Sequence, residues 1–186
     1  MKRFLLLSGV ALLTIGNAEA MSLNKNMIDP YVGVDYVYSR AHNGGLARGI
    51  KKDYHSPKFD VGMRMMQNWS MEFSYQMSGK LKSYAPEAAR HVKNDFQAFA
   101  LDMYGKYPIM CSNVGALATI GSAIYDARFK GLPDKSFTRV GYRAGLGLQY
   151  DFHKHMAARV VGRYSYVGAK RLNNFKEVTV GMLYYF

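Results

Sequence analysis

Residues 139–152 read RVGYRAGLGLQYDF, and this stretch decides the fold. Every even position from 140 to 152 carries valine, tyrosine, alanine, leucine or phenylalanine, whereas the odd positions carry arginine, glycine, glutamine and aspartate. Successive side chains of a β-strand point to opposite faces, so a period of two predicts a strand with one apolar and one polar face.

Seven further segments share this alternation. The clearest are YVGVDYVYSR at 31–40, WSMEFSYQM at 69–77 and VTVGMLYYF at 178–186. The segment at 113–126 is the weakest, because small residues occupy both of its faces. The eight expected strands cover residues 31–40, 58–65, 69–77, 95–107, 113–126, 138–152, 158–166 and 176–186.

The expected connections alternate between short and long. Short turns are predicted near 67–68, 108–113 and 153–155, and long polar loops near 41–57, 78–93, 127–136 and 168–174. Short turns at one end and long loops at the other are typical of bacterial outer-membrane barrels, which have an even number of strands.

The first 20 residues, MKRFLLLSGVALLTIGNAEA, indicate an export signal. Lys2 and Arg3 precede an apolar run at 4–15, and Ala18-Glu19-Ala20 supplies the small residues of a cleavage site. The run is shorter than the roughly 20 residues that a membrane helix needs. We therefore expect a cleaved signal peptide at 1–20 and one barrel domain at 21–186. The single Cys, Cys111, excludes an intramolecular disulfide framework.

Alternation alone does not separate a membrane barrel from a soluble, lipocalin-like barrel with its apolar face inward. Aromatic residues gather at both ends of the apolar faces, as expected where rings lie at the level of lipid headgroups. All but one of the expected strands have at least 9 residues, about the length that a tilted strand needs to cross hydrocarbon. The prediction is therefore an all-β, eight-stranded antiparallel up-and-down transmembrane β-barrel in the bacterial outer membrane.

Apolar residues at alternate positions run up to the aromatic last residue, Phe186. This pattern is similar to the C-terminal signature that the barrel-assembly machinery reads, which makes that machinery an expected partner. The predicted assembly signal comprises Val180, Met182, Tyr184 and Phe186.

The polar faces would then line a lumen that side chains just fill in a barrel of eight strands. Buried charges are tolerated only when they are paired. We expect a structural network of ion pairs in which Arg143, Arg159 and Arg163 meet carboxylates; lining of a narrow pore is the alternative. The predicted luminal residues are Asp35, Asp60, Arg64, Glu72, Asp102, Lys106, Arg139, Arg143, Arg159, Arg163 and Glu177.

Over essentially all of residues 21–186, the pattern resembles the OmpA/OmpX-type small outer-membrane barrels of the opacity-protein and surface-antigen class. The resemblance rests on the cleavage site, the segments at 31–40 and 139–152, and the terminal VTVGMLYYF. Members include adhesins, complement-resistance proteins, structural anchors and a few enzymes, so the resemblance implies a fold and a location more than one activity.

The sequence predicts no catalytic residue, no metal site and no cofactor. His153 and His155 flank one lysine in an expected turn with no serine nearby, which does not match the lipid A deacylases among small barrels. Their spacing would hold a metal only weakly, because a third ligand is not evident. His42, His55 and His91 each stand alone in expected loops.

The long loops carry most of the formal net charge of +12. They hold twelve bases against Asp53, Glu87 and Asp134. The expected partners are outer-membrane lipid, the phosphates of lipopolysaccharide and an anionic host or cell-surface ligand; nucleic acid is not expected. The predicted function is structural or adhesive, with a narrow channel, a lipid-modifying enzyme and a soluble carrier as alternatives. The basic loop residues are Arg48, Lys51, Lys52, Lys80, Lys82, Arg90, Lys93, Arg128, Lys130, Lys135, Lys170 and Arg171.

Overall fold

The computed structural model describes residues 28–43, 53–66, 68–79, 81–85, 90–109, 113–130, 136–167 and 172–186. The predicted signal peptide at 1–20 lies outside these residues, as does Cys111. Within the described ranges, no helix has the length and apolar character needed to span a membrane.

Nearly all of the described residues lie in strands, and most of these strands are longer than the alternation predicts. They are β1 (Asp29–Asn43), β2 (Asp53–Met66), β3 (Trp69–Met77), β4 (Leu81–Ala85), β5 (Arg90–Pro108), β6 (Val114–Lys130), β7 (Ser136–His153), β8 (Met156–Tyr166) and β9 (Leu172–Tyr185).

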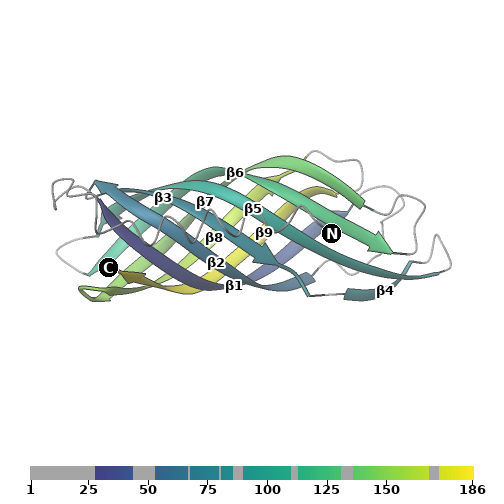
Figure 1. Ribbon diagram of the computed structural model, residues 1–186, viewed down its shortest axis with the longest axis horizontal. Helices are drawn as coiled ribbons and strands as arrows, with labels where there is room; N and C mark the ends of the chain where they lie inside the picture. Colours follow the sequence, from purple (N-terminus) through teal and green to yellow (C-terminus); the bar gives the residue numbers. More distant parts are fainter. Residues whose placement is uncertain are drawn as a thin grey trace, which may run out of the picture.

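Every strand pairs antiparallel with its neighbours, and the sheet closes on itself. The order is β3-β2-β1-β9-β8-β7-β6-β5-β4, and a further pairing of β3 with β5 completes the circle. β3 and β4 pair with successive parts of β5, since Met77 lies opposite Gln97 and Leu81 opposite Asn94. They therefore occupy one position in the barrel, and the predicted closed barrel of eight strands is confirmed (Figure 1).

The apolar faces point outward. Val34, Ile120 and Leu146 are 58%, 67% and 73% exposed, whereas Asp35 and Glu72 are buried. A soluble barrel would bury the apolar face, so the carrier-like arrangement is wrong for this chain. In hydrocarbon every backbone polar group needs an internal partner, and closure of the barrel supplies one along each strand. At the C-terminus the amide of Phe186 donates to the carbonyl of Pro30 at 3.1 Å.

The predicted short turns join β2 to β3, β5 to β6 and β7 to β8, but all four long loops are shorter than predicted, and β9 for example begins at Leu172 within 168–174. β2 begins at Asp53 inside the expected loop 41–57, β6 runs on to Lys130, and β4 with the start of β5 occupies most of 78–93. Beyond the membrane, both faces of a β-hairpin can carry polar side chains while its backbone hydrogen bonds continue. The alternation of apolar and polar residues therefore no longer shows where the strand ends. In Figure 1, β4 lies at the end of the barrel opposite the C-terminus.

Aromatic rings fill the lumen near the loop end. Tyr54, Phe96, Tyr125 and Phe175 come from four different strands and are all buried. Their ring centroids lie 5.1 Å apart between Tyr54 and Phe96, and 5.3 Å apart from Phe175 to both Phe96 and Tyr125. At the turn end a second buried cluster comprises Tyr31, Ala157, Leu183 and Tyr185. The polar site lies between these two layers.

Candidate functional site

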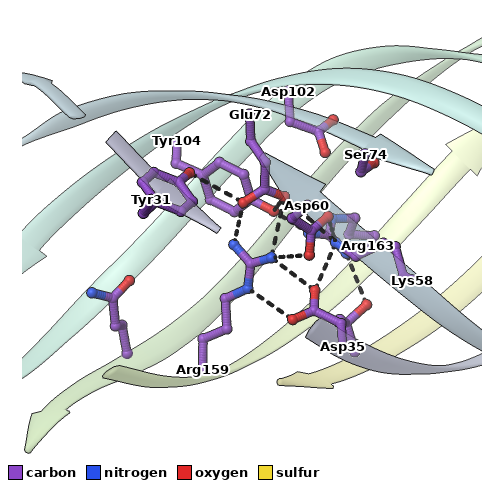
Figure 2. A network of polar contacts seen from close by, with 12 residues as sticks. Tyr31, Asp35, Lys58, Asp60, Glu72, Ser74, Asp102, Tyr104, Arg159 and Arg163 are labelled. Carbon is purple, nitrogen blue, oxygen red and sulfur yellow. Dashed lines mark hydrogen bonds and ion pairs between the residues drawn. The ribbon is translucent and has the colours of Figure 1, made fainter. Parts of the chain in front are cut away.

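Arg159 of β8 lies at the centre of the polar lumen and contacts three carboxylates on β1, β2 and β3 (Figure 2). Its Nη2 lies 2.7 Å from Asp35 Oδ2 and 2.8 Å from Asp60 Oδ2, and its Nη1 lies 2.5 Å from Glu72 Oε2. The alternation places each of these side chains inward, because each stands on the polar face of its strand. The guanidinium group presents several donors in one plane, which suits it to bridge more than one carboxylate.

Lys58 of β2 contacts the same three carboxylates from another side. Its Nζ lies 2.7 Å from Asp35 Oδ2, 3.0 Å from Asp60 Oδ1 and 3.5 Å from Glu72 Oε1. Two tyrosines complete the hydrogen bonding of Glu72, since Tyr31 donates to Oε2 at 3.1 Å and Tyr104 to Oε1 at 3.0 Å. Three carboxylates thus share two cations and two hydroxyl donors within the buried lumen.

A second ion pair lies beside this group. Arg143 of β7 donates through Nε to Asp102 Oδ1 of β5 at 2.6 Å and through Nη2 to Ser74 at 3.1 Å. Arg163 was expected to meet a carboxylate, and this is wrong among the described residues. It donates to Thr179 at 2.8 Å and to the hydroxyl of Tyr104, because its long side chain extends across the lumen toward β5.

The remaining predicted luminal residues lie outside the central group. Arg64 reaches Asp29 at 3.7 Å and stacks over the ring of Tyr185 at the turn end, where Lys106 pairs with Asp151. Glu177 is buried and accepts from Ser39 at 3.4 Å. Arg139 was predicted to be luminal but is exposed, since it lies at the loop end of β7 where the barrel opens to water.

The sequence pattern contains a signal for three members of the network that the predicted luminal set omits. Lys58 stands on the polar face of its strand, and Tyr31 and Tyr104 share the parity of Asp35 and Asp102. Their alternate positions were a sufficient signal for the inward direction. Tyrosine is expected in the aromatic girdles, but its hydroxyl also makes it a hydrogen-bond donor inside a polar lumen.

Two glycines leave room for the carboxylates. A Cβ at Gly181 would lie 1.7 Å from Oδ1 of Asp35, and one at Gly121 would lie 2.1 Å from Oδ1 of Asp102. Each glycine lies directly opposite its acid on the neighbouring strand, so a larger inward side chain would displace the ion pair. Close approach to a neighbouring group is a recognised reason for glycine within a strand.

The geometry supports a structural part for this network. Its ionised groups are buried against one another, and burial of a charge costs several kcal/mol unless ion pairs and hydrogen bonds compensate it. No group of three or more metal-binding side chains occurs in the described part of the chain. His55, exposed on the outer wall, shares a hydrogen bond with Tyr36, while Asp53 accepts from Tyr38 at 2.8 Å. These contacts do not form a relay from an acid through a histidine to a serine.

The family model of the outer membrane protein beta-barrel domain matches residues 8–186. The chain belongs to this family. No individual curated protein is similar enough in sequence to serve as a relative. The protein is thus an outer-membrane barrel, and the predicted location in the bacterial outer membrane is confirmed.

Solved structures of small outer-membrane barrels share the fold at low sequence identity. Neisserial surface protein A matches with a TM-score of 0.68 and 18% identity, over 84% of this chain and 97% of that one. Ail of Yersinia pestis matches at 0.61 and 15%, over 85% and 98%. The N-terminal barrel of Pseudomonas aeruginosa OprF matches at 0.57 and 13%, over 84% and 97%.

The basic loop residues fall largely outside what the structure describes. Arg48, Lys51, Lys52, Lys80, Lys135, Lys170 and Arg171 lie outside the described residues. Lys82, Arg90, Lys93, Arg128 and Lys130 are placed by their backbone at the loop ends of β4, β5 and β6. Residues 180–185 form the last part of β9 and Phe186 follows directly, and the reading of this segment by the assembly machinery stays a prediction.

Replacement of Arg159 by methionine should destabilise the folded barrel by about 3–5 kcal/mol, because three buried carboxylates would keep only Lys58 as a cation. The free energy of unfolding in urea, measured in lipid vesicles, tests this. Arg64→Met removes a partly exposed cation and is the control, with an expected loss below about 1 kcal/mol. Equal losses for the two variants would contradict the central importance of Arg159.

Gly181→Ala should destabilise the barrel by about 1–3 kcal/mol, since the added methyl group would collide with the Asp35 carboxylate. Gly162→Ala is the matched control, because a Cβ there would lie 3.8 Å from its nearest neighbour. Unfolding midpoints of both variants in urea provide the measurement. A Gly181→Ala barrel as stable as Gly162→Ala would show that the network has room to move.

Proposed function

We propose that this protein is a non-enzymatic surface protein with a filled lumen, whose loop end binds an anionic saccharide of another surface. The observation that carries the proposal is a row of three lysines at the end of β4, β5 and β6. Lys82 lies directly opposite Lys93, and Lys93 lies directly opposite Lys130.

The lysine row favours an anionic ligand. Neighbouring strands lie about 4.8 Å apart, so three lysines in one row place their backbones along a short line across the hairpins. Like charges directly opposite each other destabilise a sheet, and a bound polyanion would relieve that repulsion. The surrounding sequence adds more bases than acids, which raises the local concentration of anions.

The filling of the lumen supports a role at the surface rather than conduction. Aromatic rings occupy the loop end, the Arg159 network occupies the middle and the cluster around Tyr31 and Leu183 occupies the turn end. Arg159 also crosses from β8 to β1, β2 and β3, so its contacts bridge strands that are not all neighbours. An ion would have to break several of these buried contacts in passing.

One structural neighbour guides the choice of ligand. A structure of Yersinia pestis Ail in complex with the heparin analogue sucrose octasulfate matches this chain with a TM-score of 0.58. At 15% identity it supports the shared fold alone, and the ligand is a property of that protein. Sulfated saccharide is nevertheless the ligand class with which to test a basic end on this fold.

Replacing Lys82, Lys93 and Lys130 together by glutamine should weaken binding to immobilised heparin roughly tenfold, because three ion pairs to the saccharide, at about 0.5 kcal/mol each, would be lost. The apparent Kd at physiological ionic strength is the measurement, and binding of the parent protein should weaken as salt rises. The control with equal loss of charge is the triple variant Lys51→Gln, Lys52→Gln, Lys135→Gln. If both triple variants lose affinity equally, net charge acts without the row; if neither does, the proposed ligand site is wrong.

In planar bilayers the parent protein should give no sustained conductance steps, because side chains fill the lumen at all three levels. Single-channel recording on folded protein, with a detergent blank as the control, provides the test. Reproducible steps that depend on folded protein would overturn the filled lumen and return the narrow channel as the function.

A further inference from the structure

The outward faces of β1 and β9 change from apolar to cationic at the same level. On β1 the exposed side chains Val34 and Tyr36 are followed, toward the loop end, by Tyr38 and Arg40. On β9, at alternate outward positions, Val180 and Val178 are followed by Lys176. Arg40 and Lys176 lie directly opposite each other in the β1–β9 pairing, and both are exposed.

These two cations belong to a row of outward residues that crosses four strands. Asp53 of β2 lies opposite Arg40, and Tyr164 of β8 lies opposite Lys176. Asp53 Oδ1 is 3.5 Å from Arg40 Nε and also accepts the hydroxyl of Tyr38 at 2.8 Å. The row therefore has one acid, already shared with a tyrosine, against two adjacent bases.

The level of this row is that of the lipid headgroups. Tyr164 and Tyr166 are about half exposed on the outer wall at the loop end of β8, and Tyr164 belongs to the row itself. Such aromatic girdles mark the membrane interface of outer-membrane barrels. Arg40 and Lys176 thus project from the barrel wall toward the headgroups of the outer leaflet. This position distinguishes them from the loop lysines above the membrane.

The opposite side of the barrel has a different boundary. One outward row near the loop end there consists of Gln97 of β5, Asp126 of β6 and Thr138 of β7, which lie opposite one another in that order. This row contains no base. Of these two outward rows, only the one that crosses β1 and β9 carries a pair of opposed bases.

We propose that Arg40 and Lys176 bind a phosphate group of lipid A, the phosphorylated glycolipid of the outer leaflet. Directly opposed residues in an antiparallel pair have Cα atoms about 4.5–5.5 Å apart, so both side chains can reach one phosphate. Arginine donates two parallel hydrogen bonds to phosphate oxygens, and lysine adds a compact positive charge. A bound phosphate also removes the repulsion between two like charges that lie directly opposite each other.

This site lies on the barrel wall and takes a lipid of the same membrane, so it goes beyond the surface ligand proposed above. The test uses the folded protein in phosphatidylcholine vesicles with and without diphosphoryl lipid A. The temperature at which the folded form disappears on unboiled gels reports binding as a function of lipid A content. Diphosphoryl lipid A should raise this temperature for the parent protein, and chemically dephosphorylated lipid A should not.

The double variant Arg40→Gln, Lys176→Gln should need at least about tenfold more diphosphoryl lipid A for the same rise, because charge-assisted contacts to the phosphate are lost. Lys154→Gln, which removes an exposed lysine in the turn at the other end, is the matched control and should respond like the parent protein. The double variant should melt like the parent in phosphatidylcholine alone, since both side chains are exposed.

Three results would overturn the proposal. The first is an unchanged lipid A response in the double variant, and the second is an equal response to dephosphorylated lipid A. The third is stabilisation by inorganic phosphate in vesicles without lipid A, lost in the double variant, which would make the pair a general anion site. Heparin binding that fails while the lipid A response persists would sink the proposed function alone.

Discussion

The fold depends on Arg159 satisfying three buried carboxylates at once. A barrel that presents apolar residues to lipid must turn its polar residues inward, where an unpaired charge is costly. Arg159 reaches Asp35, Asp60 and Glu72 from the far side of the lumen, so one guanidinium joins β8 to three strands with which β8 shares no backbone ladder. Because lipid surrounds the barrel, the polar side chains point inward. Their contacts across the lumen then hold the strands in one register.

A lysine and two tyrosines supply further partners to these carboxylates, and glycines leave room for them. Lys58 supplies a second cation to the same three acids, while Tyr31 and Tyr104 donate to Glu72 without adding charge. The acids need space as well as partners, and Gly181 provides it beside Asp35. The many glycines on the polar faces therefore reflect crowding by inward side chains in a barrel of only eight strands.

Alternation predicted which way side chains point, because parity along a strand is a local property. It gave the strand number and put Asp35 and Arg159 on the polar faces of their strands, and the aromatic girdles then predicted that these faces point inward. The height of a side chain along the barrel axis depends on the stagger between strands, and the sequence of a single strand does not contain that stagger. Parity alone therefore could not place Arg139 above the filled lumen or predict that Arg163 would reach Tyr104. It also missed the aromatic layer, because Tyr54 was assigned to a loop that proved to be the start of β2.

The two populations of charge in this chain have opposite balances. Among the residues that the structure describes, the buried charged ones are Asp35, Lys58, Asp60, Glu72, Asp102, Arg143, Arg159, Arg163 and Glu177, which are five acids and four bases. Since the whole chain carries +12, the entire positive excess lies outside that buried set. Balanced charges inside neutralise one another, whereas the rest of the chain holds 21 bases against 8 acids. A filled barrel of this kind leaves its outer surface as the place where binding can occur, and the surplus of bases there favours ligands that carry phosphate or sulfate.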